Sequence, residues 1–476
     1  MKRIYLPAYL RSHRAHDAPS AVRRVALARM WGRAARALRR AALLLPLALS
    51  ALALLLLTRG PPAPPPTPAP VAMQLQGIPA VSEPHFQDNN DIEVPATEDE
   101  VSSRPWYMVG GRARPTAHDP DAKMFPEDAP GEDRIIDQLM YTLPEDEDVP
   151  VKTILLANGF SPWGVRGGRR EFIKNKCPVD RCSLTATRTD HADAILFKDH
   201  HTALNIKRDI KQLWILYYLE CPYHTPPLGL TAYDVFNYTA TYRRDSDIVA
   251  PYERWVYHNP KITEKVLDRN YAANKTKKVA WFVSNCHASN RRLQYARKLS
   301  KHIQVDIYGA CGAHHCPKSD PNCLEMLDRE YKFYLAFENS NCRDYVTEKF
   351  FVNGLKHSVL PIVMGARPSE YAAVAPPNSY IHVEEFASPK ELAAYLHRLD
   401  QDDTLYNSYF KWKDTGEFIN TYFFCRVCAM VHASERRLRR AHYTDVQAWW
   451  REAACTRQDW RAEGKPPADN DYRVRD

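Results

Sequence analysis

Residues 333–350 have the sequence FYLAFENSNCRDYVTEKF, and this stretch determines the predicted fold class. Positions 333–337 are apolar and typical of a buried strand, and the polar residues at 338–340 end it. A short polar loop leads to Thr347, Glu348 and Lys349, which open a segment predicted to be helical over 347–357. Strand, loop and helix start together indicate an α/β fold. Such a fold binds anions at this place, because free N–H groups and the positive dipole end of the helix face the loop.

The neighbouring Glu348 and Lys349 side chains admit two interpretations. A carboxylate beside an ammonium group can bind a sugar hydroxyl and a phosphate together; the alternative is a capped helix with a solvated ion pair. The complete stretch 333–350 resembles the donor-site signature of the α1,3-fucosyltransferases, glycosyltransferase family 10, which take fucose from GDP-fucose with inversion. The resemblance implies that Glu348 holds fucose hydroxyls and that Asn339 and Tyr345 line the nucleotide and ribose side.

The N-terminus predicts a membrane anchor. Residues 1–40 carry eleven Lys or Arg side chains and one acid, a charge of +10, and residues 41–57 are uncharged and apolar or small. This run has the minimum length for a bilayer-spanning helix. A cleaved signal peptide is the rival, but its apolar core is shorter, and here Arg59 and a proline tract follow. We expect an uncleaved signal-anchor at 41–57, a cytoplasmic tail at 1–40, and a single-pass type II protein in the Golgi membrane with its catalytic part in the lumen.

Charge and composition after the anchor exclude one class of function. The whole chain carries +8, which leaves −2 for residues 41–476, so a basic nucleic-acid-binding surface is not expected. Residues 61–70 contain seven prolines, and the rest of 58–150 is rich in Pro, Asp and Glu. We predict a largely disordered stalk over 58–150.

Strand and helix patterns alternate along the remainder. Strands are predicted at 151–158, 194–197, 213–219, 279–284, 305–308, 333–337 and 360–364, with helices at 291–301, 325–331, 347–357 and 389–399. The alternation indicates α/β domains with parallel sheets. The resemblance implies the glycosyltransferase B architecture: an acceptor-side domain at 151–265 and a Rossmann-like GDP-fucose-binding domain at 277–400 that face a cleft. A helical segment at 401–476 is expected to pack back on the acceptor domain.

An inverting glycosyl transfer needs something to neutralise the departing diphosphate. The Asp-x-Asp strings at 146–148 and 245–247 are candidate metal sites. The first lies in the acidic stalk, and the second follows Arg243 and Arg244, so an internally paired cluster is the preferred interpretation. We therefore expect no required metal or cofactor, with divalent metal stimulation left open. The resemblance instead implies that Lys349 and Arg291 neutralise the diphosphate. Arg292 is adjacent to Arg291, and the alternative interpretation of Arg291 is an exposed arginine at a helix start.

The same reaction needs a general base that takes the proton of the attacking hydroxyl. Glu220 ends an apolar strand before a proline-containing turn, where partial burial could raise its pKa toward neutrality. A lone glutamate at such a place is more often an ordinary loop acid. The string 220–226 resembles the acceptor-domain segment of the family, which implies that Glu220 is the base. The histidines nearby are interpreted as structural: His191, His200, His201 and His224.

Eleven cysteines, all after the predicted anchor, indicate disulfides in an oxidising lumen, with at least one cysteine outside intrachain pairs. A Cys-x-x-Cys pair at 425–428 has no second ligand pair for zinc and no thioredoxin-like context. The resemblance implies the bridges Cys177–Cys425 and Cys182–Cys428; the family's remaining bridge is not expected, because residues 280 and 330 are Ala and Glu. Two sequons predict N-glycosylation at Asn237 and Asn274.

The acceptor is suggested by two further strings. Residues 155–184 and the sequence CRVCAMVH at 425–432 are most similar to the plant and invertebrate enzymes that fucosylate O3 of the innermost GlcNAc of N-glycans. A Lewis-type or LacdiNAc α1,3-fucosyltransferase acting on antenna GlcNAc is the nearest alternative. A membrane-tethered glycan-binding protein without activity is the alternative of another class. The expected partners are GDP-fucose and an N-glycan acceptor.

Overall fold

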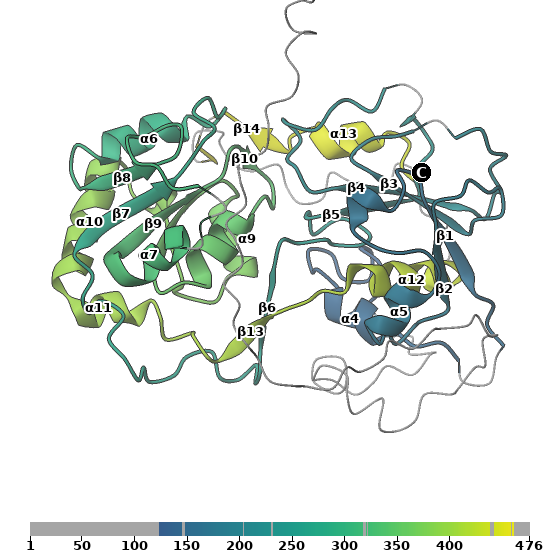
Figure 1. Ribbon diagram of the computed structural model, residues 1–476, viewed down its shortest axis with the longest axis horizontal. Helices are drawn as coiled ribbons and strands as arrows, with labels where there is room; N and C mark the ends of the chain where they lie inside the picture. The colour runs from purple at the N-terminus through teal and green to yellow at the C-terminus, as the bar shows by residue number, and fades with distance from the viewer. Residues whose placement is uncertain are drawn as a thin grey trace, which may run out of the picture. The chain divides into compact units, whose positions relative to one another are not determined.

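The structure is a computed structural model that describes residues 123–144, 148–202, 204–229, 232–317, 320, 322–437, 442–457 and 459–460. Two parallel five-stranded sheets form its framework (Figure 1). The prediction of an α/β fold with parallel sheets is confirmed. The predicted tail, the anchor at 41–57 and the stalk up to residue 122 lie outside the described residues. Within those residues, every helix is too short or too polar to cross a bilayer.

The first sheet has the strand order β2-β1-β3-β4-β5. Its parallel strands are β1 (Lys152–Leu156), β2 (Cys182–Thr185), β3 (Ala194–Lys198), β4 (Leu213–Tyr218) and β5 (Tyr238–Thr241). Successive residues of β3 alternate between two hydrophobic clusters, with Leu196 in one and Ile195 in the other. Both faces are therefore buried, which explains the nearly continuous apolar sequences of β3 and β4.

The second sheet has the order β12-β11-β9-β7-β8 and is also parallel. Its strands are β7 (Lys277–Phe282), β8 (Val305–Tyr308), β9 (Tyr331–Phe337), β11 (Leu360–Met364) and β12 (Ile381–His382). One face packs against α6 (Arg292–Leu299), α10 (Pro389–Gln401) and α11 (Asp403–Ser408). The other face packs against α7 (Asn322–Glu330) and α9 (Pro368–Val374).

The predicted helix over 347–357 takes a different form. Only α8 (Glu348–Phe350) is α-helical, and a π-helical segment, Phe351–Leu355, follows it. The Gly354 backbone lies close to β11, where an added Cβ would come within 2.9 Å of Pro361 Cβ. Helical geometry continues from α8 into this π-helical segment, over 348–355, which is slightly shorter than the predicted 347–357.

The C-terminal segment is divided between the two sheets. Helix α11 belongs to the core of the second sheet, whereas α12 (Phe423–Ala433) and α13 (Val446–Arg451) pack against the two faces of the first. Two antiparallel pairs join distant parts of the chain: β6 (Arg254–Tyr257) with β13 (Gly416–Ile419), and β10 (Asn341–Cys342) with β14 (Cys455–Thr456). The expectation that all of 401–476 packs on the acceptor side is therefore wrong for α11.

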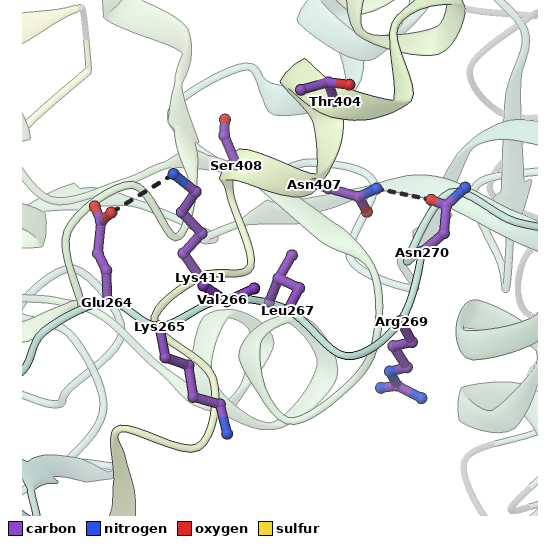
Figure 2. Close-up of a pocket in the computed structure, with 10 residues that line it drawn as sticks. All are labelled: Glu264, Lys265, Val266, Leu267, Arg269, Asn270, Thr404, Asn407, Ser408 and Lys411. Atoms are coloured by element: carbon purple, nitrogen blue, oxygen red, sulfur yellow. Dashed lines mark hydrogen bonds and ion pairs between the residues drawn. The ribbon is translucent and has the colours of Figure 1, made fainter.

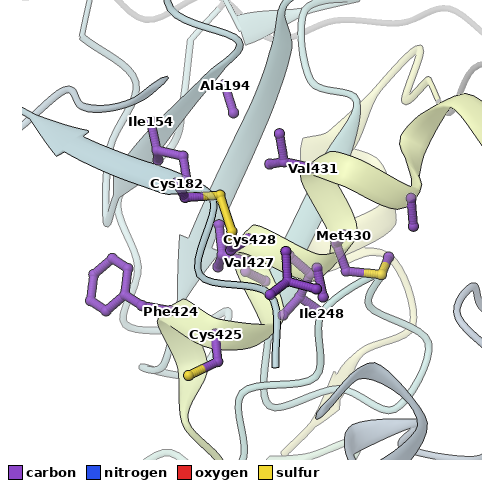
Figure 3. Close-up of a cluster of buried hydrophobic side chains, with 14 of the residues drawn as sticks. Ile154, Cys182, Ala194, Ile248, Phe424, Cys425, Val427, Cys428, Met430 and Val431 are labelled. Atoms are coloured by element: carbon purple, nitrogen blue, oxygen red, sulfur yellow. A yellow bond between two sulfur atoms is a disulfide. The ribbon is translucent and has the colours of Figure 1, made fainter. Parts of the chain in front are cut away.

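Helix α12 is bonded covalently to the first sheet. Bridges Cys177–Cys425 and Cys182–Cys428 have the pairing that the family resemblance implied. Figure 3 shows the Cys182–Cys428 bridge among the apolar side chains of Ile154, Val427 and Val431. The other disulfides among the described residues are Cys286–Cys311, Cys316–Cys323 and Cys342–Cys455.

Residues 123–144 are ordered and belong to the core. The prediction of a largely disordered stalk over 58–150 is therefore wrong for these residues. Helix α4 (Ile135–Met140) packs against α12 with the apolar residues of this stretch. The buried Arg134 guanidinium donates to the carbonyl of Ser246 at 2.6 Å, and Gln138 Nε2 donates to the carbonyl of Asp247 at 2.8 Å. The local excess of Pro and acids concealed these few anchoring residues.

Candidate active site

Glu220 follows the carboxyl end of β4, and its side chain forms hydrogen bonds with residues that follow β9. Its Oε1 accepts hydrogen bonds from the Tyr345 hydroxyl at 2.8 Å and from Asn339 Nδ2 at 3.3 Å. The backbone N–H of Cys221 donates to the same oxygen at 2.9 Å. These contacts bring together three of the predicted site residues, although Glu220 precedes the other two by more than a hundred positions.

The environment of Glu220 changes one expectation. Burial by itself would raise the pKa of Glu220, but the hydrogen bonds from Cys221, Tyr345 and Asn339 outweigh burial and lower that pKa. The predicted upward shift is therefore wrong. Its side chain is 46% exposed, so the carboxylate is both ionised and accessible. Tyr345 is 2% exposed, and its ring packs against Tyr242 at 5.1 Å between centroids, which orients the hydroxyl.

The second-sheet side is organised by a buried carboxylate, Glu338, to which no role was assigned from sequence. Glu338 accepts from the Thr347 N–H at 2.8 Å and from the Thr347 hydroxyl at 2.9 Å, and it pairs with Lys349 Nζ at 3.2 Å. Gly365 allows this arrangement, because a Cβ there would lie 2.6 Å from Glu338 Cγ. The repeated hydrogen bonds to one carboxylate fix the start of α8.

Lys349 lies between two carboxylates. Its Nζ is 3.2 Å from Glu338 Oε2 and 3.2 Å from Glu348 Oε1. Burial would lower the pKa of Lys349, but both carboxylates outweigh burial and raise it, so the ammonium group stays charged. The Glu348 side chain is 51% exposed. It is therefore available to a ligand, as the sequence predicted for a sugar-binding residue.

The structure separates the two adjacent arginines at the start of α6. Arg292 is buried, and its guanidinium donates to the carbonyls of Phe337 at 2.6 Å and Asn285 at 3.2 Å. Arg291 is exposed, and its guanidinium makes no hydrogen bond or ion pair with any residue that the structure describes. Asn290, its neighbour, donates to the Glu338 carbonyl at 2.9 Å. Of the two arginines, only Arg291 is therefore available to a ligand.

The aspartates at 245 and 247 are both engaged by arginine. Asp245 pairs with Arg243 at 2.6 Å and Arg343 at 3.3 Å, and Asp247 pairs with Arg437 at 3.0 Å. Asp247 also accepts from the backbone N–H of Thr239 at 2.9 Å. These contacts agree with the interpretation of an internally paired cluster. Of the other string, 146–148, the first two residues lie outside the described part.

The two predicted glycosylation sites differ in exposure. Asn237 is 3% exposed, and its Oδ1 accepts from Arg208 at 2.7 Å and from the Trp214 N–H at 2.9 Å. The prediction for Asn237 is therefore wrong, because its side chain lies inside the fold at the start of β5. Asn274 is exposed in a left-handed turn with φ of 65° just before β7.

Two side chains beside Glu220 were not assigned to the site from the sequence. Cys221 is fully buried and is the free cysteine among the described residues. His224 Nδ1 lies 3.6 Å from Glu220 Oε1 and 3.4 Å from Cys221 Sγ. The spacing of 220, 221 and 224 on one turn was the available signal. The other three histidines lie elsewhere: His191 is exposed, His200 contacts Asn158, and His201 packs among aromatic rings.

A surface cavity of about 570 Å³ lies away from these residues (Figure 2). Its polar groups largely bond to each other: Glu264 pairs with Lys411 at 3.9 Å, and Asn407 donates to Asn270 at 2.8 Å. None of the predicted site residues line it. The lining residues are Glu264, Lys265, Val266, Leu267, Arg269, Asn270, Thr404, Asn407, Ser408 and Lys411.

Comparison with known proteins places the chain in a family. Residues 150–253 match the fucosyltransferase N-terminal region, and residues 272–449 match the C-terminal region of glycosyltransferase family 10 (fucosyltransferase). Together these two matches cover the strands of both sheets and every predicted donor and base residue. The chain belongs to glycosyltransferase family 10, the fucosyltransferases, and the resemblance inferred from residues 333–350 is confirmed.

Two named relatives agree with this assignment, and one solved structure is also similar to part of the chain. Glycoprotein 3-alpha-L-fucosyltransferase A of Drosophila melanogaster is 56% identical over 372 residues, which cover 76% of this chain and 73% of the relative. A human 4-galactosyl-N-acetylglucosaminide 3-alpha-L-fucosyltransferase is 36% identical over 56% of this chain and 75% of its own. A crystal structure of an alpha1,3-fucosyltransferase with GDP aligns with a TM-score of 0.40 and 18% identity, covering 62% of this chain and 93% of that chain.

Proposed function

We propose that this protein transfers L-fucose from GDP-fucose to O3 of the innermost, Asn-linked GlcNAc of N-glycans. The observation that carries the proposal is the contact of Glu220 with Asn339 and Tyr345. It brings an exposed, ionised carboxylate beside the donor-binding segment of a fucosyltransferase. The choice of acceptor is supported by the 56% identity to a relative named as a glycoprotein 3-alpha-L-fucosyltransferase.

Glu220 acts as the general base in this proposal. Its lowered pKa keeps the carboxylate ionised in a mildly acidic lumen, so it can accept the proton of the attacking O3 hydroxyl. The acceptor hydroxyl competes with the Tyr345 hydroxyl and the Asn339 amide for hydrogen bonding to Glu220 Oε1. Loss of these hydrogen bonds raises the basicity of the carboxylate as the acceptor enters, because hydrogen bonds to the charged form lower a carboxyl pKa.

The donor is held by the second-sheet side. Glu348 accepts hydrogen bonds from fucose hydroxyls, and Asn339 and Tyr345 line the nucleotide and ribose side. When Glu348 binds fucose, Lys349 keeps its ion pair with Glu338 and its hydrogen bond to Thr347 Oγ1, and its third N–H points at the diphosphate. Arg291 supplies the second positive charge. The two cations stabilise the departing GDP, which is the electrostatic task of the site.

The remaining expectations form part of the same proposal. The protein is a single-pass type II Golgi membrane protein with a signal-anchor at 41–57, and its two sheets form a glycosyltransferase B arrangement of acceptor-side and donor-side domains. No metal is required, because arginines engage both carboxylates of the 245–247 string. Asn274 carries a glycan; its exposed turn is compatible with one.

The proposal is tested with the purified full-length chain in detergent. GDP-fucose is supplied with a small N-glycan that has the intact chitobiose core and, separately, with LacNAc, and the products are located by mass spectrometry and NMR. We expect transfer to O3 of the innermost GlcNAc. Transfer to LacNAc alone would establish the antenna-specific alternative. Binding of the N-glycan without transfer to either acceptor would establish a glycan-binding protein.

A further inference from the structure

Glu220 has two neighbours that the proposed reaction does not use. Cys221 Sγ and His224 Nδ1 are 3.4 Å apart, and His224 Nδ1 is 3.6 Å from Glu220 Oε1. A thiol sulfur, an imidazole nitrogen and a carboxylate oxygen thus lie within 4.8 Å of one another. One contact to the His224 imidazole would be enough for an ordinary hydrogen-bonded turn. Here the imidazole lies close to both the Cys221 thiol and the Glu220 carboxylate.

These three donors match the ligands and the spacing of a zinc site. Zinc bonds of about 2.3 Å to sulfur and about 2.0–2.1 Å to nitrogen and oxygen, at tetrahedral angles, separate S from N by about 3.6 Å and N from O by about 3.3 Å. The measured separations of 3.4 Å and 3.6 Å are close to these edges. The third pair of donors, Cys221 Sγ and Glu220 Oε1, lies within 4.8 Å.

We propose that Glu220, Cys221 and His224 form a zinc-binding site that inhibits the enzyme. The ion takes the carboxylate that serves as general base, so metal binding and transfer exclude each other. The inhibitory effect rests on the proposed function, whereas the binding of zinc does not. As the Zn–S bond forms, the Cys221 thiol releases its proton to solvent, and the fourth coordination position is left for water.

The local structure supports access and preorganisation. His224 and Glu220 side chains are 36% and 46% exposed and give an ion a path to the buried thiol. The turn is closed by the His224 N–H, which donates to the Cys221 carbonyl at 2.9 Å. The Cys221 thiol donates to Asn339 Oδ1 at 3.8 Å, and this contact is given up when the thiol loses its proton.

A second group of donor atoms on the described chain does not compete. Cys182, Cys428 and His432 also lie within 4.8 Å of one another. The two sulfurs are bonded to each other in a disulfide, so neither can act as a thiolate ligand. The 220–224 turn is therefore the place to test.

The test uses the full-length chain, stripped of metal with a chelator and titrated with Zn²⁺ alone by calorimetry and with Co²⁺ alone by visible spectroscopy. We expect one Zn²⁺ per chain and, with Co²⁺, tetrahedral d–d bands with a thiolate charge-transfer band. His224→Gln should weaken Zn²⁺ binding by a factor of roughly 10–100 or more, since even loss of an outer partner has such an effect. Cys221→Ser should abolish the charge-transfer band. His191→Gln, an exposed histidine of the same sheet region, is the matched control and should bind as the parent does.

Fucosyl transfer is then measured at increasing Zn²⁺. In His224→Gln, the Zn²⁺ concentration that halves the activity should rise by the same factor as the Zn²⁺ dissociation constant. In His191→Gln, both values should equal those of the parent. Absence of the thiolate band in the parent, or equal Zn²⁺ binding by parent and His224→Gln, would overturn the site. A parent that binds Zn²⁺ through this turn and keeps full activity would overturn the inhibitory role. If no transfer occurs at all, the proposed function fails, and the spectra still decide the site.

Discussion

Two glutamates occupy equivalent places in the two sheets and have opposite properties. Glu220 follows β4 of the first sheet, and Glu338 follows β9 of the second. Glu220 is 46% exposed and has a lowered pKa, whereas Glu338 is fully buried and burial raises its pKa. Glu338 receives its hydrogen bonds from Thr347 and its ion pair from Lys349, all from the start of α8.

The difference shows how one residue type serves two purposes. At Glu220, hydrogen bonds outweigh partial burial and leave a charged carboxylate open to a ligand. At Glu338, complete burial dominates, and the carboxylate instead positions the residues around it. A strand end places a carboxylate, but its surroundings determine whether the group meets substrate or supports the residues that do.

The largest effect is expected at Glu220. The Glu220→Gln variant should lose transfer by a factor of about 10²–10⁴, because a general base contributes that much, and should retain GDP-fucose binding. Initial rates with saturating donor and calorimetric titration with GDP-fucose give the two readouts. Glu132→Gln, a surface glutamate with 57% side-chain exposure, is the control. Parental turnover by Glu220→Gln would remove the proposed distinction between the two glutamates.

The next effect concerns the covalent link of the first sheet. Cys428→Ser and Cys182→Ser should each lower the free energy of unfolding by about 2–5 kcal/mol, and the two losses should be equal because each variant breaks the same bridge. The reason is that this bridge closes a loop with a sequence separation of 246, against 7 for Cys316–Cys323. Chemical denaturation compares these variants with Cys316→Ser, whose loss should be smaller. An equal or larger loss in Cys316→Ser would contradict the argument from loop length.

Lys349 tests the second-sheet side directly. Lys349→Ala should weaken GDP-fucose binding by roughly tenfold to a hundredfold, the value of a charge-assisted hydrogen bond of about 1.5–3 kcal/mol. It should also lower thermal stability, because Glu338 is then buried without its ion pair. Lys356→Ala is a matched control from the same segment, paired at the surface with Glu253. Equal donor affinity in both variants would show that Lys349 serves Glu338 alone.

The pH dependence should reveal which hydrogen bonds lower the pKa of Glu220. In the parent, the acid limb of kcat/KM should lie below about pH 4.3, the usual glutamate pKa. Removing a hydrogen bond to the ionised form raises a carboxyl pKa, so Tyr345→Phe should shift this limb to higher pH. Tyr406→Phe is the control, since its hydroxyl donates to the Lys332 carbonyl within the core of the second sheet. A downward or absent shift in Tyr345→Phe would contradict the explanation.

The smallest effect is expected from chelation. Activity should persist in excess EDTA, because Arg291 and Lys349 rather than a metal neutralise the diphosphate in the proposed site. Any zinc on the 220–224 turn would be removed by the same treatment, so activity should remain equal or rise. Complete loss that Mn²⁺ or Mg²⁺ restores would refute the absence of a metal requirement and direct attention to Asp245 and Asp247.

Much of the fold follows from sequence because its strands are buried on both faces. The predicted strand at 360–364 coincides with β11 and the one at 333–337 lies within β9, and both strands are buried along their whole length. In contrast, β2 and β5 were not predicted, because their sequences CSLT and YTAT contain half or more hydroxyl or sulfur side chains. Their strand form depends on pairing with β1 and β4. The folded structure of residues 123–144 was missed for a similar reason. It depends on hydrogen bonds from Arg134 and Gln138 to carbonyl groups far away in the sequence.

The class of the protein follows from the amino-acid sequence alone, because the stretch 333–350 and the Cys-x-x-Cys pair are local patterns that a family resemblance identifies. The alternation of strands and helices follows in the same way, since apolar periodicity is a property of neighbouring residues. Three features could be read only from the folded chain: which arginine of the pair 291–292 is available, that Asn237 is buried, and that the pKa of Glu220 is lowered. Each of these depends on atoms contributed by residues far away in the chain, and burial and hydrogen bonding are set by those atoms.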